Sequence, residues 1–183
     1  MATRKSQIDN RNFLSPVGFK FNLQRSPGVA YFCNQANVPD LSLGVALQPN
    51  YLRDIPTPGD KVDFGDLNLR FLVDEDLTNY MEIQNWIRGM GFPESLEEIY
   101  KFQNSNPNMD PNDKSIDLLS DGTLNVLTST QNTNFKVKFE GLFPVSISDL
   151  TFDATDTDID YLTAEVTFKY TIYKIVDLNG DPL

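Results

Sequence analysis

The sequence has no histidine, a single cysteine and no long apolar run. Without histidine it lacks the usual general base and the commonest metal ligand, so we expect neither an enzyme nor a cofactor or metal site. Cys33 has no second cysteine for an internal disulfide, and a buried structural thiol is expected. No apolar run approaches the roughly 20 residues that cross a bilayer, so no membrane partner is expected.

Basic residues are also scarce, because 15 Lys and Arg stand against 26 Asp and Glu and give a formal net charge of −11. A nucleic-acid-binding surface needs cations gathered on one face, and this composition argues against one. An acidic surface instead suits a conduit along which DNA slides without sticking. The length of 183 residues suits one domain. We expect a polar N-terminal arm over residues 1–16 and a single domain over residues 17–183.

Alternation of apolar and polar residues predicts strands along much of the chain. Residues 17–24 and 29–33 flank the turn-forming Ser26-Pro27-Gly28, which predicts an opening hairpin. A second turn is predicted at Ser120-Asp121-Gly122 and a third over residues 131–134. The remaining predicted strands lie over residues 41–47, 62–73, 116–119, 123–128 and 135–139.

Residues 48–61 contain Pro49, Pro56, Pro58 and Gly59, which predict an irregular, extended excursion that is not a helix. Apolar side chains in this segment have little prospect of a local core. They either contact another subunit or fold back onto their own domain. The candidate subunit contacts are Pro49, Tyr51, Leu52, Ile55 and Pro56.

Helical spacing of apolar residues predicts one helix over about residues 78–90, with Ile83 and Trp86 on its buried stripe. A second, short helix is expected over about residues 95–103. The strongest pattern lies over residues 141–175, where a short strand and an acidic turn precede a long closing strand. Its alternation places Phe168 and Tyr170 in the core. The chain is therefore predicted to be mainly β (α+β), an antiparallel barrel or sandwich with a flanking helix.

The acidic turn contains Asp153, Asp156, Asp158 and Asp160, and the last three have the spacing that starts a helix–loop–helix calcium loop. Tyr161 stands where that loop needs glycine and Thr167 where it needs glutamate, which favours a solvated or lumen-facing loop. A pair of carboxylates could also hydrolyse glycosides, but nothing selects such a pair from 26 acids.

Several of these segments, taken in order, carry a resemblance. They are the opening strands with Ala36-Asn37-Val38-Pro39, then Asp54-Ile55-Pro56, Gly59-Asp60, Asp74-Glu75-Asp76, the helix with Trp86, and EGLFPVSISDL over residues 140–150. Over residues 17–175 the chain resembles the tail tube protein family of contractile-tailed bacteriophages. That family is related in fold to phage-like injection and type VI secretion tubes.

The resemblance implies a structural virion protein whose homo-hexameric rings stack into a conduit for DNA ejection. It implies sheath, baseplate, tape-measure or neck proteins as partners, DNA only in transit, and a location in the virion tail after assembly in the host cytoplasm. The acids Asp153, Asp156, Asp158 and Asp160 would face the lumen or a ring surface. A specialised ring at the tube end, at the baseplate or neck, has the same fold and stays open. From another class, a monomeric β-sandwich carbohydrate-binding module stays open too.

Overall fold

In the computed structural model, which describes residues 13–91, 93–95, 97, 118–153, 155 and 161–183, one long strand connects the two halves of the fold. This strand, β7 (Thr133–Ile147), pairs in its first half with β6 (Ser120–Leu127) on one side and β9 (Ile172–Val176) on the other. Its second half pairs with β8 (Thr163–Lys169).

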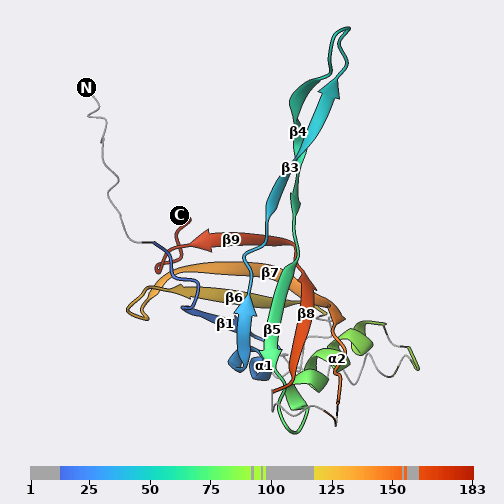
Figure 1. The fold of residues 1–183 in the computed structure, drawn as a ribbon, viewed down its shortest axis with the longest axis vertical. Helices are drawn as coiled ribbons and strands as arrows, with labels where there is room; N and C mark the ends of the chain where they lie inside the picture. Colours follow the sequence, from blue (N-terminus) through green and yellow to red (C-terminus); the bar gives the residue numbers. More distant parts are fainter. Residues whose placement is uncertain (1–12, 92, 96, 98–117, 154, 156–160) are drawn as a thin grey trace.

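The sheet order is β1-β6-β7-β8-β5-β2, with β9 also paired to β7. Here β1 is Phe19–Leu23, β2 is Cys33–Ala36 and β5 is Leu67–Leu72. In Figure 1, the layer of β1, β6, β7 and β9 runs across the direction of β2, β5 and β8. Crossed layers joined by a bent strand are typical of orthogonal β packing. The predicted mainly β, antiparallel architecture is confirmed.

The strand β7 bends where it passes from one layer to the other. Gly141 has a φ of +66°, and a Cβ at this position would lie 2.6 Å from the Thr171 Oγ1. The Thr171 N–H donates to the Glu140 carbonyl at 2.9 Å, so the closing strand bends beside Gly141. The single closing strand predicted from alternation is therefore wrong, because residues 170–171 divide it into β8 and β9. Alternation does not reveal a bend that a neighbouring strand imposes.

The core lies between the crossed layers and is built by the inward side chains of the alternating strands. In β8, Ala164, Val166 and Phe168 are at most 1% exposed, as the alternation predicts. The other buried apolar residues are Phe21, Leu23, Val29, Leu67, Leu69, Phe71, Ile83, Trp86, Leu124, Val126, Val137, Phe139, Leu142 and Val176.

The helix predicted over residues 78–90 is confirmed as α2 (Thr78–Gly91), and it packs Ile83 and Trp86 into the core. The Trp86 indole lies 6.1 Å from the Phe168 ring and donates its N–H to the Leu118 carbonyl at 2.9 Å. The helix predicted over residues 95–103 falls largely outside the described residues. Within the described part of the chain, no helix is long and apolar enough to cross a membrane.

The predicted opening hairpin is wrong. Residues 27–31 form a short helix, α1 (Pro27–Tyr31), because proline at the first helical position has the φ angle that a helix needs. This turn buries Val29 and separates β1 from β2, so that β1 pairs with β6 and β2 pairs with β5. Ser, Pro and Gly are favoured both in turns and at the start of a helix, so the sequence Ser26-Pro27-Gly28 does not distinguish the two.

Two further boundaries differ from the prediction. The strand expected over residues 62–73 is divided at Gly65, whose N–H donates to the Asp40 carbonyl at 3.0 Å as the chain turns from β4 (Ile55–Phe64) into β5. The turn expected at residues 120–122 lies inside β6, where the register with β7 shifts between Ser120 and Gly122. Turn-forming residues make a bulge there instead. The turn predicted over residues 131–134 lies slightly earlier, over residues 128–132, with Gln131 at a φ of +62°, and β7 begins at Thr133.

Replacing Trp86 with alanine removes the largest fully buried side chain and leaves the Leu118 carbonyl without its indole donor. We expect the Trp86→Ala variant to lose about 3–5 kcal/mol of unfolding free energy, measured by chemical denaturation of the unassembled protein. Met81→Ala, on the exposed side of the same helix, is the control and should change it by less than about 0.5 kcal/mol. Equal losses in both variants would contradict this account of the core.

The Glu82 carboxylate of α2 has a buried Oε2 without a hydrogen-bond partner among the described residues, and burial raises the pKa of Glu82. An acid with a raised folded-state pKa destabilises the fold as pH rises through that value. We therefore expect Glu82→Gln to raise the melting temperature at about pH 8, with a gain that shrinks towards about pH 5. Glu165→Gln, at an exposed carboxylate, serves as the control. A gain that is independent of pH would contradict the assignment.

Candidate assembly surfaces

The hairpin of β3 (Leu41–Gln48) and β4 has two chemically different faces. Residues directly opposite each other on antiparallel strands share a face. One face, called the apolar face below, pairs Leu41 with Phe64, Leu43 with Val62, Val45 with Pro58, and Leu47 with Pro56. The other face pairs Ser42 with Asp63, Ala46 with Thr57, and Gln48 with Ile55. The hairpin is thus an amphipathic ribbon.

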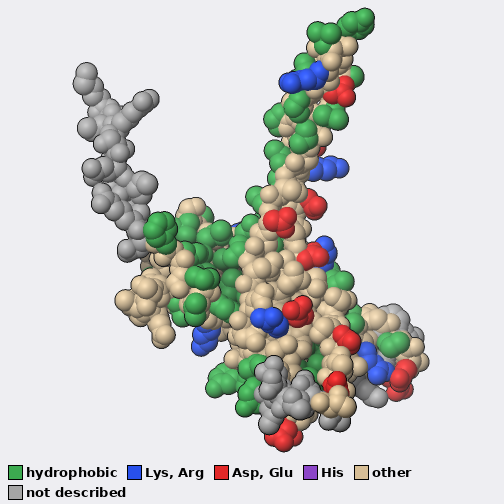
Figure 2. All heavy atoms as spheres, viewed as in Figure 1, with side chains coloured by type: hydrophobic (Ala, Val, Ile, Leu, Met, Phe, Trp, Pro, Cys, Tyr) green, Lys and Arg blue, Asp and Glu red, His purple; other side chains and the backbone are tan. Residues whose placement is uncertain are grey.

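This ribbon projects from the body and does not fold back onto it (Figure 1). On the apolar face Leu43, Val45 and Leu47 are 53–65% exposed, and at the tip Tyr51 and Leu52 are 99% and 90% exposed. Figure 2 shows hydrophobic side chains along the ribbon and at its tip. The interpretation that these residues cover their own domain is therefore wrong, and their apolar surface is open to another molecule.

The segment predicted to be irregular over residues 48–61 is so only in part, because residues 49–54 are irregular whereas residues 55–61 belong to β4, which contains Pro56 and Pro58. In a two-stranded ribbon the outer edge of β4 needs no donors, so prolines at alternate positions are compatible with pairing to β3. The register shifts between Leu43 and Val45, where Gly44 and Gly59 approach so closely that a Cβ on Gly59 would collide with the Gly44 backbone. The prolines and glycines of this segment are therefore compatible with a pair of strands.

An aromatic cluster holds the base of the hairpin. Phe64 packs edge-on against Tyr173 at 5.6 Å and Tyr170 at 6.3 Å between ring centroids. The Tyr170 hydroxyl donates to the Gly65 carbonyl at 2.9 Å, and burial raises the pKa of Tyr170 to about 12. Lys169 forms an ion pair with Asp66 beside it. These contacts attach the ribbon to the β8–β9 bend.

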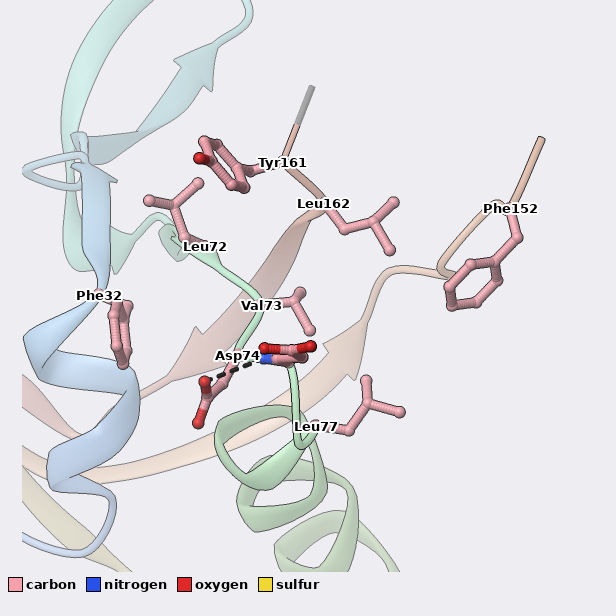
Figure 3. Close-up of a pocket in the computed structure, with 9 residues that line it drawn as sticks. Phe32, Leu72, Val73, Asp74, Leu77, Phe152, Tyr161 and Leu162 are labelled. Carbon is pink, nitrogen blue, oxygen red and sulfur yellow. Dashed lines mark hydrogen bonds between the residues drawn. The ribbon is translucent and has the colours of Figure 1, made fainter. Parts of the chain in front are cut away.

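A cavity of about 560 Å³ lies at the other end of β5 (Figure 3). Most of its lining is apolar, and two acids, Asp74 and Glu75, border it. Leu77, with a φ of +58°, ends the turn that precedes α2, and the Asp74 carboxylate accepts the Glu75 N–H at 2.9 Å. The remaining lining residues are Phe32, Leu72, Val73, Phe152, Tyr161 and Leu162.

The ends of the sheet are open. Strands β1 and β2 are the terminal strands of the sheet order, and each has one edge without a partner strand among the described residues. Unpaired edges are templates for pairing with another chain.

Four lysines share the outer face of the β1-β6-β7-β9 layer, at Lys20, Lys136, Lys138 and Lys174. One of them, Lys174, bonds to the Glu140 carboxylate at 2.7 Å. Composition alone indicated that cations do not gather on one face. That expectation is incomplete, because these lysines alternate with buried residues on paired strands and so come to lie on the same outer face.

Of the acidic turn, only Asp153 lies in the described residues, whereas Asp156, Asp158 and Asp160 lie outside them. Asp153 is exposed, and its carboxylate accepts the Thr155 hydroxyl at 2.6 Å and the Thr155 N–H at 2.8 Å, which lower the pKa of Asp153. Among the described residues no three His, Cys, Asp or Glu side chains are placed to hold a metal ion.

The predicted site residues thus divide by position. Trp86, Ile83 and Phe168 are buried and Tyr170 is partly buried, whereas Tyr51, Leu52 and Ile55 are exposed on the hairpin. Sequence reasoning missed the apolar face. Its signal was present, since two alternating runs, residues 41–47 and 62–64, flank the turn at the tip, but the prolines concealed the pairing. The cavity had no local signal because its lining comes from four separate segments.

The family model described as phage tail tube protein matches residues 9–176. Among curated proteins, none matches the chain. Among solved structures, the chain is similar to one in the PVC sheath-tube complex of an extracellular contractile injection system in the extended state. The TM-score is 0.61 and the identity 16%, over 97% of this chain and 100% of that one.

The tube-terminating cap of the anti-feeding prophage is similar with a TM-score of 0.58 and 13% identity, over 97% of this chain and 99% of that one. The PVC sheath/tube terminator in the extended state is similar with a TM-score of 0.57 and 15% identity, over 91% of this chain and 99% of that one. At these identities the likeness concerns the fold. The family match spans most of the sequence, and the chain belongs to the phage tail tube protein family.

Proposed function

We propose that this chain is the repeating subunit of a tail tube, in which six copies form a ring and stacked rings form the conduit for DNA. Its partners would be sheath, baseplate, tape-measure and neck proteins, in a virion tail assembled in the host cytoplasm. Family membership favours this structural role over a carbohydrate-binding module or a hydrolase.

The amphipathic hairpin is the observation that carries the proposal. An isolated two-stranded ribbon is marginally stable in water, so a ribbon with an uncovered apolar face needs a partner. Leu43, Val45 and Leu47 point to one side of it and are more than half exposed. Burial of each such side chain contributes about 1.5–3 kcal/mol, so repetition around a ring gives a large total. Contact with another subunit through the apolar face would cover these side chains and stabilise the ribbon.

The open edges of β1 and β2 support lateral contacts within the ring. A neighbouring copy can continue the sheet from either edge, using main-chain hydrogen bonds for affinity. Each subunit has both edges, so the contact is head-to-tail and closes when the rotation between copies divides a full turn. The formal charge of −11 per copy makes the assembly strongly acidic and suits passage of DNA.

A ring at the tube end is a second candidate, favoured by the similarity to the anti-feeding prophage cap and the PVC terminator. Copy number in purified particles, measured by quantitative mass spectrometry against the sheath protein, separates the two. We expect roughly equal copies for a tube-body subunit. A number of copies sufficient for a single ring would assign the chain to the tube end.

Replacing Leu43 and Leu47 together with serine removes two exposed apolar side chains from the hairpin without touching the core. We expect wild-type protein to form sixfold rings and tubes in negative-stain electron microscopy, and the double variant to need at least about tenfold more protein to do so. Ser42→Thr, on the other face, should assemble normally. A wild type that remains monomeric at high concentration, or a double variant that assembles as well as the control, would refute the role of the apolar face.

A further inference from the structure

The hairpin tip and the cavity lie at opposite ends of the molecule. Strand β5 begins beside the hairpin base at Leu67 and ends at Leu72, which lines the cavity. In Figure 1 the tip is at the upper end of the longest axis, whereas the end of β5 and the start of α2 are at the lower end. A projection at one end and a recess at the other can join copies along one axis.

The cavity suits apolar side chains. Its volume of about 560 Å³ lies within the range of about 300–1,000 Å³ that buries most of a drug-sized ligand, so two large side chains can enter. The rings of Phe152 and Tyr161 are 74% and 81% exposed at its margin. Figure 3 shows these two rings with Leu72, Val73 and Leu162 around the same space. A second molecule would remove this apolar surface from water.

The tip offers matching chemistry. Tyr51 and Leu52 are almost fully exposed, and Arg53 follows them directly in the turn. The cavity is bordered by the carboxylates of Asp74 and Glu75. An apolar pair followed by a cation is therefore complementary to an apolar recess bordered by two anions. Charge complementarity of this kind selects a partner and its orientation.

We propose that Tyr51 and Leu52 of one copy insert into the Phe32–Leu72–Tyr161 cavity of a second copy, with Arg53 beside Asp74 and Glu75. The inference rests on the proposed tube, since it assigns the receiving site for the hairpin of the adjacent ring. The two surfaces differ, so the contact is heterologous and repeats without closing along the long axis.

Cysteine cross-linking tests the contact directly. Both partners carry Cys33→Ser, which removes the native thiol. One protein then carries Leu52→Cys at the tip and the other Leu77→Cys in the cavity. We expect disulfide-linked dimers in the oxidised mixture of the two and none in either protein alone. The matched control, Val45→Cys mixed with Leu77→Cys, should give at least about tenfold less dimer, because Val45 lies on the strand away from the tip.

Charge reversal tests the pairing of Arg53 with Glu75. Arg53→Glu and Glu75→Arg should each reduce tube yield severalfold, and the double variant should recover at least half of the wild-type yield, measured by sedimentation and electron microscopy. Lys61→Glu makes the same charge change elsewhere on the hairpin, and Glu75→Arg should not rescue it.

The outcomes separate the two proposals. Tubes that form normally without the cross-link between positions 52 and 77, and without charge-swap rescue, would overturn the cavity assignment and leave the tube function standing. That result would also follow if the tip binds a sheath protein. Absence of rings and tubes at any concentration would overturn the proposed function and the cavity assignment together.

Discussion

The bend at Gly141 is the constraint on which the rest of the structure depends. Because β7 turns there, one strand pairs with β6 and β9 in the first layer and with β8 in the second. Gly141 has a positive φ, and Thr171 lies so close to it that a side chain at this position would collide with the Thr171 Oγ1. The bend in β7 and the bend between β8 and β9 therefore lie side by side. The crossed layers enclose the core that Trp86 and Phe168 fill.

The corner also places the hairpin. Tyr170 and Tyr173 stand at the β8–β9 bend, and their hydroxyls donate to the carbonyls of Gly65 and Pro39, where the two hairpin strands leave the body. The ring of Phe64 completes this anchor. The most exposed part of the molecule is therefore attached to its most constrained part. A ribbon held in this way presents its apolar face in a fixed direction, which a shared contact between identical copies requires.

Much of this fold follows from sequence pattern alone. The alternation around Val166 and the helical spacing of Ile83 and Trp86 specify buried faces, and the structure has them. Several of the failures share one physical cause, which is that Pro and Gly have several structural uses. Pro27 begins a helix and Pro56 lies on a free strand edge. The cavity was beyond local reasoning because Phe32, Leu72 and Tyr161 meet only after the layers cross.

The hairpin leaves the body at one end only, and this gives any linear assembly of the chain a direction. A tube built from such copies has two chemically different mouths. In the proposed tube one mouth would display the exposed Tyr51 and Leu52 side chains, and the other would display the cavities bordered by Asp74 and Glu75. The component that starts such a tube would meet one of these surfaces and the component that ends it would meet the other, so the two components would need opposite shapes and opposite charges.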